Sequence, residues 1–161
     1  MMRTLKNLFK YAALLHALFF WASCQSNKTA DPARSFALNE ITVSQIQQAY
    51  NAGRYSVREI VQLYIDRIKA IDRDGYKLNS IIIINLDALT IADSLDQLLK
   101  AGQKSGPLFG IPVILKDNID THDQMPTTAG SRVLKDSYPR RDSWVAKSCA
   151  RQVRLSWAKL I

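Results

Sequence analysis

Cysteine is scarce in this sequence: there are two, Cys24 and Cys149, in a chain of 161 residues. Two cysteines do not resemble a disulfide framework, and a lipid attached to one of them would exclude any disulfide. Internal repeats and low-complexity tracts are also missing. What remains is 47% hydrophobic and 22% charged residues, which is typical of a globular protein with one modest domain.

A basic stripe interleaved with aromatic residues is missing as well. The net charge of +8 would suggest nucleic acid or an anionic membrane as a partner. However, the first 23 residues and the last 14 carry +3 each, which leaves +2 for residues 24–147. We therefore predict that the chain does not bind nucleic acid.

The longest apolar run, residues 11–23, is too short to span a bilayer comfortably, and polar sequence follows it at once. Three basic residues precede it, as in an export signal. The run ends in small residues before Cys24, so residues 1–23 resemble a bacterial lipoprotein signal in which Cys24 becomes the lipidated first residue. The alternative is an ordinary signal peptide cut near Ala22. Either way we expect an exported protein, membrane-anchored through Cys24 or periplasmic.

The polar stretch 24–40 predicts a tether, and the folded part begins near Ile41. Thr42 or Ser44 caps a first predicted helix, which Gly53 ends.

A second predicted helix starts at Ser56, where Glu59 completes a capping box. Its apolar residues recur at helical spacing, so one face packs on a core. These residues are Val57, Ile60, Val61, Tyr64, Ile65 and Ile68. A third predicted helix is capped by Asp87 and ended by Gly102.

Two runs of strand length, residues 78–86 and 111–116, are apolar without alternation. Such runs are typical of strands that are covered on both faces. The order helix, helix, strand, helix, strand predicts an α/β domain with a buried sheet.

The second of these strands ends in Lys116, and polar residues follow it. Open α/β sheets build their sites at the carboxyl ends of strands. The pattern alone nevertheless favours a lysine that simply reaches solvent where the strand ends. We do not predict a metal site at Asp117, Asn118, Asp120 and His122, because their spacing is not that of an EF-hand.

The stretch GPLFGIPVILKDNIDT, residues 106–121, is followed by MPTTAGSRVL, residues 125–134. Together they resemble the opening of the amidase signature family, whose pattern is Gly-x-Pro, a strand ending in Lys-Asp-Asn, a short polar loop and Thr-Thr-x-Gly-Ser. The resemblance covers about residues 41–147. It implies that they form the N-terminal part of the amidase signature fold, a mixed sheet covered by helices and incomplete in this chain.

This resemblance implies a chemistry. Members hydrolyse carboxamides with a serine nucleophile, a bridging serine in a cis peptide and a lysine, and Lys116 maps onto that lysine as the general base. A base must be neutral when it accepts a proton, and burial favours neutral lysine. We therefore expect the apolar strand to carry Lys116 inward. Asp117 and Asn118 are expected to fix the turn and the neighbouring loops.

Thr128, Gly130 and Ser131 map onto a loop that lines the same site. The resemblance implies that they orient Lys116 or the bridging serine, and that Ser131 is not the nucleophile. The implied substrate is a small-molecule or peptide amide, and no cofactor or metal is implied.

The sequence departs from the family in one respect. The glycine- and serine-rich stretch that carries both serines is missing from these 161 residues, so we expect the chain to be truncated and inactive. The last segment, SCARQVRLSWAKLI or residues 148–161, fits poorly as the continuation of a helix or strand.

Read from the third base of each codon, the back-translated tail permits the family's continuation Lys-Leu-Arg-x-Ala-Gly-Ala-Val-Ile-Leu-Gly-Lys-Thr-Asn. We therefore predict that a single-base deletion puts residues 148–161 out of frame, and that Cys149, Trp157 and the basic tail are not sites. The alternative is a genuine non-catalytic exported lipoprotein or binding fragment.

Overall fold

The computed structural model describes residues 38–104, 106–153 and 156–160. The predicted signal, Cys24 and nearly all of the predicted tether lie outside the described residues, so those predictions stay predictions. Within the described residues, the helices are too short and too polar to cross a membrane.

Helix α2 runs over Val43–Asn51. Of the two candidate caps, Thr42 is the one used: its side chain accepts from the backbone N–H of Gln45, and the Gln45 side chain accepts from that of Thr42. Gly53 follows the helix with φ +62°, a conformation that favours glycine. The predicted start and end of this helix are confirmed.

Helix α3 runs over Val57–Arg67 and begins with the predicted capping box between Ser56 and Glu59. The chain then continues as a six-residue π-helix, η2, over Ile68–Arg73, which the sequence did not lead us to expect. Of the predicted apolar face, Val57, Ile60 and Val61 are fully buried.

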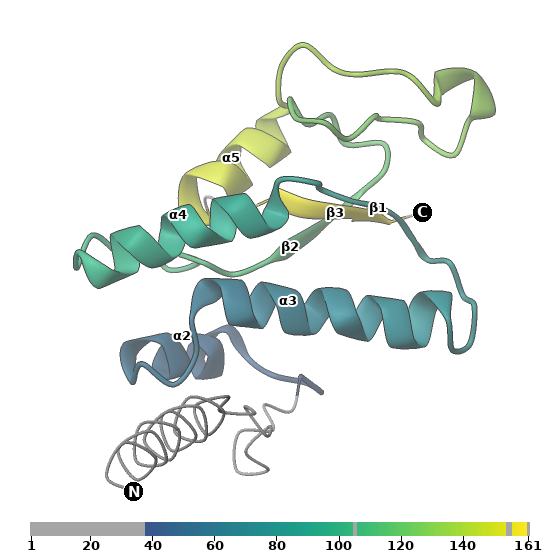
Figure 1. Cartoon of the computed structure of the whole chain (residues 1–161). Helices are drawn as coiled ribbons and strands as arrows, with labels where there is room; N and C mark the ends of the chain where they lie inside the picture. Colours follow the sequence, from purple (N-terminus) through teal and green to yellow (C-terminus); the bar gives the residue numbers. More distant parts are fainter. Residues whose placement is uncertain (1–37, 105, 154–155, 161) are drawn as a thin grey trace, which may run out of the picture. The chain divides into compact units, whose positions relative to one another are not determined.

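Helix α4, Ala88–Lys100, packs against α3 (Figure 1). Asp96 reaches from α4 to the start of α3 and accepts from the backbone N–H groups of Val57 at 2.7 Å and Arg58 at 3.1 Å. It thereby satisfies two of the amides that a helix N-terminus leaves without intrahelical partners. The prediction that Asp87 caps α4 is wrong: Asp87 holds the cap position, but its side chain accepts from Gln124 instead.

The sheet has three strands in the order β1-β3-β2: β1 Ile81–Ile84, β2 Val113–Lys116 and β3 Ser156–Leu160. Strand β3 pairs antiparallel with β1 and parallel with β2. The sheet is therefore mixed, as the family resemblance implied. The expectation that both faces of each strand are covered is wrong for β2, since Ile114 is 42% exposed.

The tail is structured where its sequence predicted a poor fit. Helix α5 covers Trp144–Val153 and therefore continues into the predicted out-of-frame segment, and β3 lies between the other two strands (Figure 1). The physical reason is tertiary. A strand in the central position forms backbone hydrogen bonds on both sides, and these do not depend on the side chains that the tail supplies.

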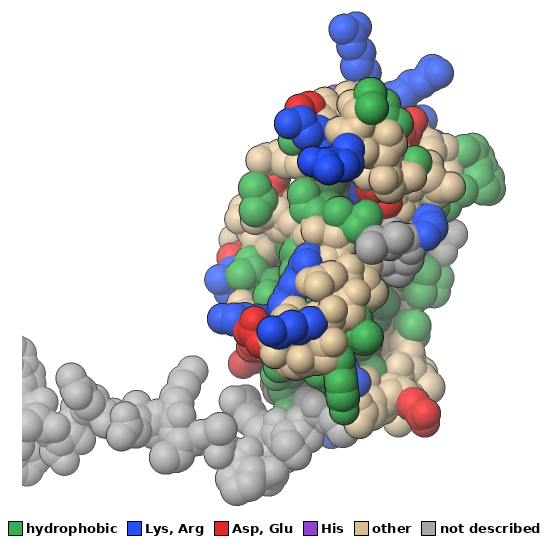
Figure 2. Space-filling model, turned by 90° about the vertical axis from the view of Figure 1, so that its right-hand side faces the viewer, with side chains coloured by type: hydrophobic (Ala, Val, Ile, Leu, Met, Phe, Trp, Pro, Cys, Tyr) green, Lys and Arg blue, Asp and Glu red, His purple; other side chains and the backbone are tan. Residues whose placement is uncertain are grey.

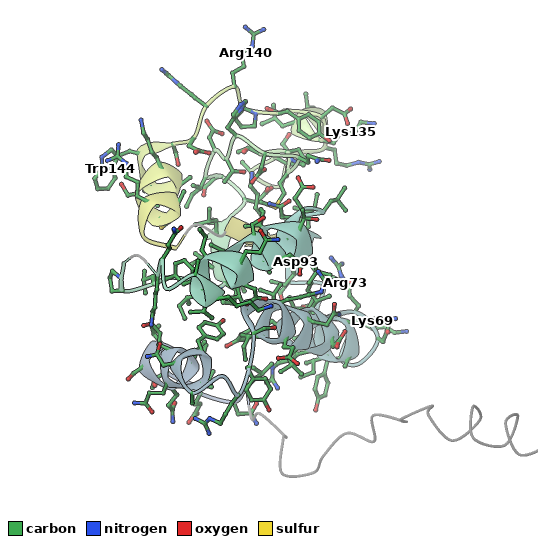
Figure 3. The ribbon with its side chains drawn as sticks, turned by 60° about the vertical axis from the view of Figure 1, so that its left-hand side comes forward. Lys69, Arg73, Asp93, Lys135, Arg140 and Trp144 are labelled. Carbon is green, nitrogen blue, oxygen red and sulfur yellow. The ribbon has the colours of Figure 1, made fainter. Side chains whose placement is uncertain are left out.

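Phe109, Met125 and Leu115 are among the buried apolar residues of the core. Several large apolar side chains remain exposed, and Figure 2 shows such side chains lying among lysines and arginines on one face. Trp144, at the start of α5, is 81% exposed and projects away from the body of the domain, as Arg140 does (Figure 3). The described residues therefore do not bury all of their apolar surface.

Candidate functional site

Lys116 is the last residue of β2, as the sequence predicted, but its side chain is exposed. It forms no hydrogen bond or ion pair with the residues that the structure describes. Successive side chains of a strand point to opposite faces. Leu115 and Asp117 are buried, whereas Ile114 and Lys116 point to the face that the described residues leave open. The expectation that the strand carries Lys116 inward is therefore wrong for this chain.

Asp117 is the buried member of the Lys-Asp-Asn motif, with 2% of its surface exposed. Its Oδ2 accepts from the hydroxyl of Thr128 and, at 3.4 Å, from the backbone N–H of Gly130. Its backbone carbonyl accepts from the N–H of Ala129 at 3.2 Å. Asp117 thus holds Thr128–Gly130 against the end of β2, which agrees with its predicted role of fixing neighbouring loops.

The loop that Asp117 holds has an unusual backbone. Ala129 and Gly130 both have positive φ, at +49° and +76°. For alanine this conformation is sterically costly, and it persists where surrounding bonds fix it. Those bonds are the three to Asp117, together with the N–H of Ser131, which donates to the carbonyl of Thr128 at 2.8 Å.

The structure therefore brings Asp117, Thr128 and Gly130 together, with Ser131 following in the same turn. It does not bring them to Lys116, which points to the other face of β2. Asn118 is exposed after the strand end. Whether these residues serve catalysis stays a prediction.

One buried charged group was not among the predicted site residues. Lys159, in β3, is 0% exposed, and its ammonium donates to the carbonyls of Met125 and Pro126 and to the hydroxyl of Thr127. Sequence reasoning missed Lys159 because it lies in the segment expected to be out of frame. The available signal was the codon overlap at this position, which permits lysine in the shifted frame too.

Burial lowers the pKa of Lys159 below the ordinary lysine value of 10.5. The carboxylates of Asp123, Asp117 and Asp120 act in the opposite direction and raise it. Three acidic groups thus face the buried ammonium from the loops around the carboxyl end of β2.

Within the described residues, no three His, Cys, Asp or Glu side chains lie close enough together to hold a metal ion. His122, from the polar loop, donates its backbone N–H to Asp142 at 2.6 Å, and its ring nitrogen pairs with the carbonyl of Pro139 at 3.1 Å. This histidine therefore ties two loops together.

An open depression of about 340 Å³ lies between the α2–α3 connection and α4. Its polar lining includes Ser56, Glu59 and Asp96, all of which bond to the first turn of α3. None of the predicted site residues lines it, and its polar groups are already used by the helix. We assign it no role.

Comparison with known proteins gives consistent results. A family model described as Amidase matches residues 59–152, more than half of the chain. The match runs five residues beyond Lys147 into the segment that we predict to be out of frame, and the frame prediction itself remains untested.

Relatives and solved structures agree with the family match. A probable amidase of Arabidopsis thaliana is 38% identical over 115 residues, which is 70% of this chain and 22% of that protein. A glutamyl-tRNA(Gln) amidotransferase protein from Alkaliphilus metalliredigens is 37% identical over 111 residues, 68% of this chain and 22% of that protein.

The crystal structure of the native peptide amidase of Stenotrophomonas maltophilia matches with a TM-score of 0.71 and 34% identity, over 76% of this chain and 25% of that one. The chain thus spans about a fifth to a quarter of the length of the proteins it matches.

Proposed function

Because the chain belongs to the amidase family, we propose that it is the lysine-bearing N-terminal part of an amidase that hydrolyses a carboxamide C–N bond. The observation that carries this proposal is the family match over residues 59–152, which includes the Lys-Asp-Asn strand end and the Thr-Thr-x-Gly-Ser loop. The position of Lys116 at the carboxyl end of β2 fits a reacting group, since strand ends of α/β sheets are where such groups gather.

In the proposed mechanism Lys116 is the general base. It takes a proton, through a bridging serine, from the serine that attacks the amide carbonyl, and later returns it to the leaving amine. Asp117 fixes the loop next to the strand end and does not touch the substrate. The two serines and the N–H groups that stabilise the oxyanion come from a glycine- and serine-rich segment that these 161 residues do not contain.

The exposure of Lys116 supports the proposal that these residues are inactive alone. A base has to be neutral when it accepts a proton, and burial is the means by which proteins favour neutral lysine. The described residues leave Lys116 in solvent, so this chain supplies neither the burial nor the serines. Completion of the fold would cover the face of β2 that carries Ile114 and Lys116.

The substrate class follows the relatives only at a coarse level. One matched structure is a peptide amidase, so a C-terminal peptide amide is the first substrate to test, with a small aromatic or aliphatic amide beside it. We further propose that the protein is exported and anchored by a lipid on Cys24, so that its substrate is extracytoplasmic. This part rests on the sequence of residues 1–24.

The test compares the chain as it stands with a product of the same gene in which one adenine is restored at the codons for Lys147 and Ser148. We expect the 161-residue chain to release no ammonia from peptide amides, and the frame-restored product to release it. Lys116→Ala should abolish that release, while Lys147→Ala, an exposed lysine on α5, should leave it unchanged. Turnover by the 161-residue chain that requires Lys116 would refute the missing-serine argument.

Anchoring is tested separately. Labelled fatty acid should be incorporated into the wild-type protein and not into Cys24→Ser, and the wild type should partition with membranes. A protein that is exported but unlabelled would instead support the ordinary signal peptide cut near Ala22.

A further inference from the structure

Two buried groups of opposite charge contact the same loop from different strands. The loop is Met125–Ser131, which crosses the carboxyl end of β2. Asp117, just after β2, accepts from the second half of this loop, at Thr128 and Gly130. Lys159, in β3, donates to the first half.

The three bonds of Lys159 use the whole donor capacity of its ammonium. They go to the carbonyl of Met125 at 3.5 Å, the carbonyl of Pro126 at 3.0 Å and the hydroxyl of Thr127 at 2.9 Å. A lysine that is fully buried and directs every donor at three consecutive residues fixes the position of that segment. Bonds to a charged donor are the stronger kind of protein hydrogen bond.

The register of the sheet explains why the two charges lie close together. In the parallel pair β2–β3, Lys159 is the partner of Leu115. Leu115 and Asp117 point to the same face of β2, because residues two apart in a strand share a face. Lys159 and Asp117 therefore lie on one face, and the charge of Asp117 acts on Lys159.

From this arrangement we propose that Lys159 is a positioning residue. Its ammonium and the Asp117 carboxylate hold the Met125–Ser131 loop between them, and the loop loses its fixed position without the ammonium. The geometry of the loop is independent of any activity. Its meaning for catalysis, as the support of residues beside the Lys116 strand end, rests on the proposed function.

The two reading frames of the tail agree on this residue. Lysine stands at position 159 in the frame as given, and the codon that overlaps Ala158 and Lys159 permits lysine in the shifted frame. The same positioning group is therefore available to the chain whether or not residues 148–161 are out of frame.

The experiment measures amide hydrogen exchange of the purified full chain by mass spectrometry. The reporting peptide covers Met125–Ser131, where the N–H groups of Thr127, Ala129 and Ser131 are hydrogen-bonded. A peptide from α3 serves as the internal reference. Lys159→Met keeps most of the volume and removes the charge, and Lys147→Met is the same change at an exposed lysine. Loss of bonds to a charged donor should speed loop exchange by about tenfold or more, with α3 unchanged.

A rescue distinguishes the ammonium from simple packing. Lys159→Cys, made in a chain that also carries Cys24→Ser and Cys149→Ser, is alkylated with bromoethylamine while unfolded and then refolded, which places an amine back at nearly the same distance. We expect the alkylated protein to recover slow loop exchange and the unalkylated one to remain fast. Loop exchange that Lys159→Met leaves unchanged, or that the restored amine does not slow, would overturn the proposal.

If circular dichroism shows that Lys159→Met does not fold, Thr127→Val replaces it. This variant removes one of the three acceptors and keeps the lysine, so exchange in the loop should rise by about threefold. No rise would also overturn the proposal. None of these outcomes depends on turnover, so the proposed function stands or fails separately.

Discussion

The Asp117 carboxylate gives the sharpest test of how the candidate site is held together. In Asp117→Ala the hydroxyl of Thr128 and the N–H of Gly130 lose their shared acceptor. Hydrogen bonds to a charged group contribute about 1.5–3 kcal/mol each. The Gly130 bond, at 3.4 Å, is long and contributes less. One opposing effect is that Oδ1 of Asp117 is buried without a hydrogen-bond partner among the described residues, so its removal relieves a desolvation cost.

The net expectation for Asp117→Ala is a loss of about 3 kcal/mol in the free energy of unfolding. Thr128→Val removes only the hydroxyl bond and should cost about 1.5 kcal/mol. Asp136→Ala, whose side chain is 78% exposed, should change stability by less than about 0.5 kcal/mol. Urea unfolding of the purified chain, followed by circular dichroism at constant m-value, measures all three.

The reasoning would be refuted if Asp117→Ala cost no more than Asp136→Ala, since the carboxylate would then contribute nothing to the loop. An Asp117→Ala cost equal to that of Thr128→Val would instead show that the Gly130 bond is negligible.

Three further predictions concern the rest of the domain. Gly110→Ala should lower the free energy of unfolding by about 1–3 kcal/mol, because φ is +72° and the added Cβ would lie 2.9 Å from a methyl group of Val57; Gly102→Ala, with φ +69° and open space, isolates the backbone part of that cost. Asp96→Ala should cost about 1–3 kcal/mol in urea unfolding, since two amides of α3 lose their acceptor, whereas Asp93→Ala should cost less than about 1 kcal/mol because its ion pair is half exposed. For Lys159 the pKa is lowered in the folded state, so the unfolded chain binds more protons between that lowered value and 10.5. The free energy of unfolding should therefore rise with pH across this window, and Lys159→Met should remove the rise; a slope unchanged by the substitution would contradict the assignment.

Local signals in the sequence predicted the helical half of the domain well. Thr42 and Ser56 start their helices with capping boxes because the partners three residues later, Gln45 and Glu59, are written next to them. These bonds form within one turn, so nothing distant decides them. Asp87 shows the limit of such signals: it holds a cap position, but a distant residue, Gln124, takes its carboxylate.

The candidate site divides in the same way. The motifs around Lys116 and Thr128 led to the family, and the pairing of Asp117 with Thr128 and Gly130 agrees with the predicted role of the motif. The orientation of Lys116 was predicted wrongly. An apolar run indicates that a strand is buried, but the run does not specify which of the two faces its neighbours cover.

By itself, then, the sequence determined the helix starts, the strand that ends in Lys116 and the family to which the chain belongs. Only the tertiary structure decided that Lys116 is exposed while Asp117 is buried, and that the tail forms the central strand. The physical reason is that caps and turns are formed by residues a few positions apart. Burial of a strand face and the environment of Lys159 depend on contacts between segments more than thirty residues apart, which no local pattern specifies.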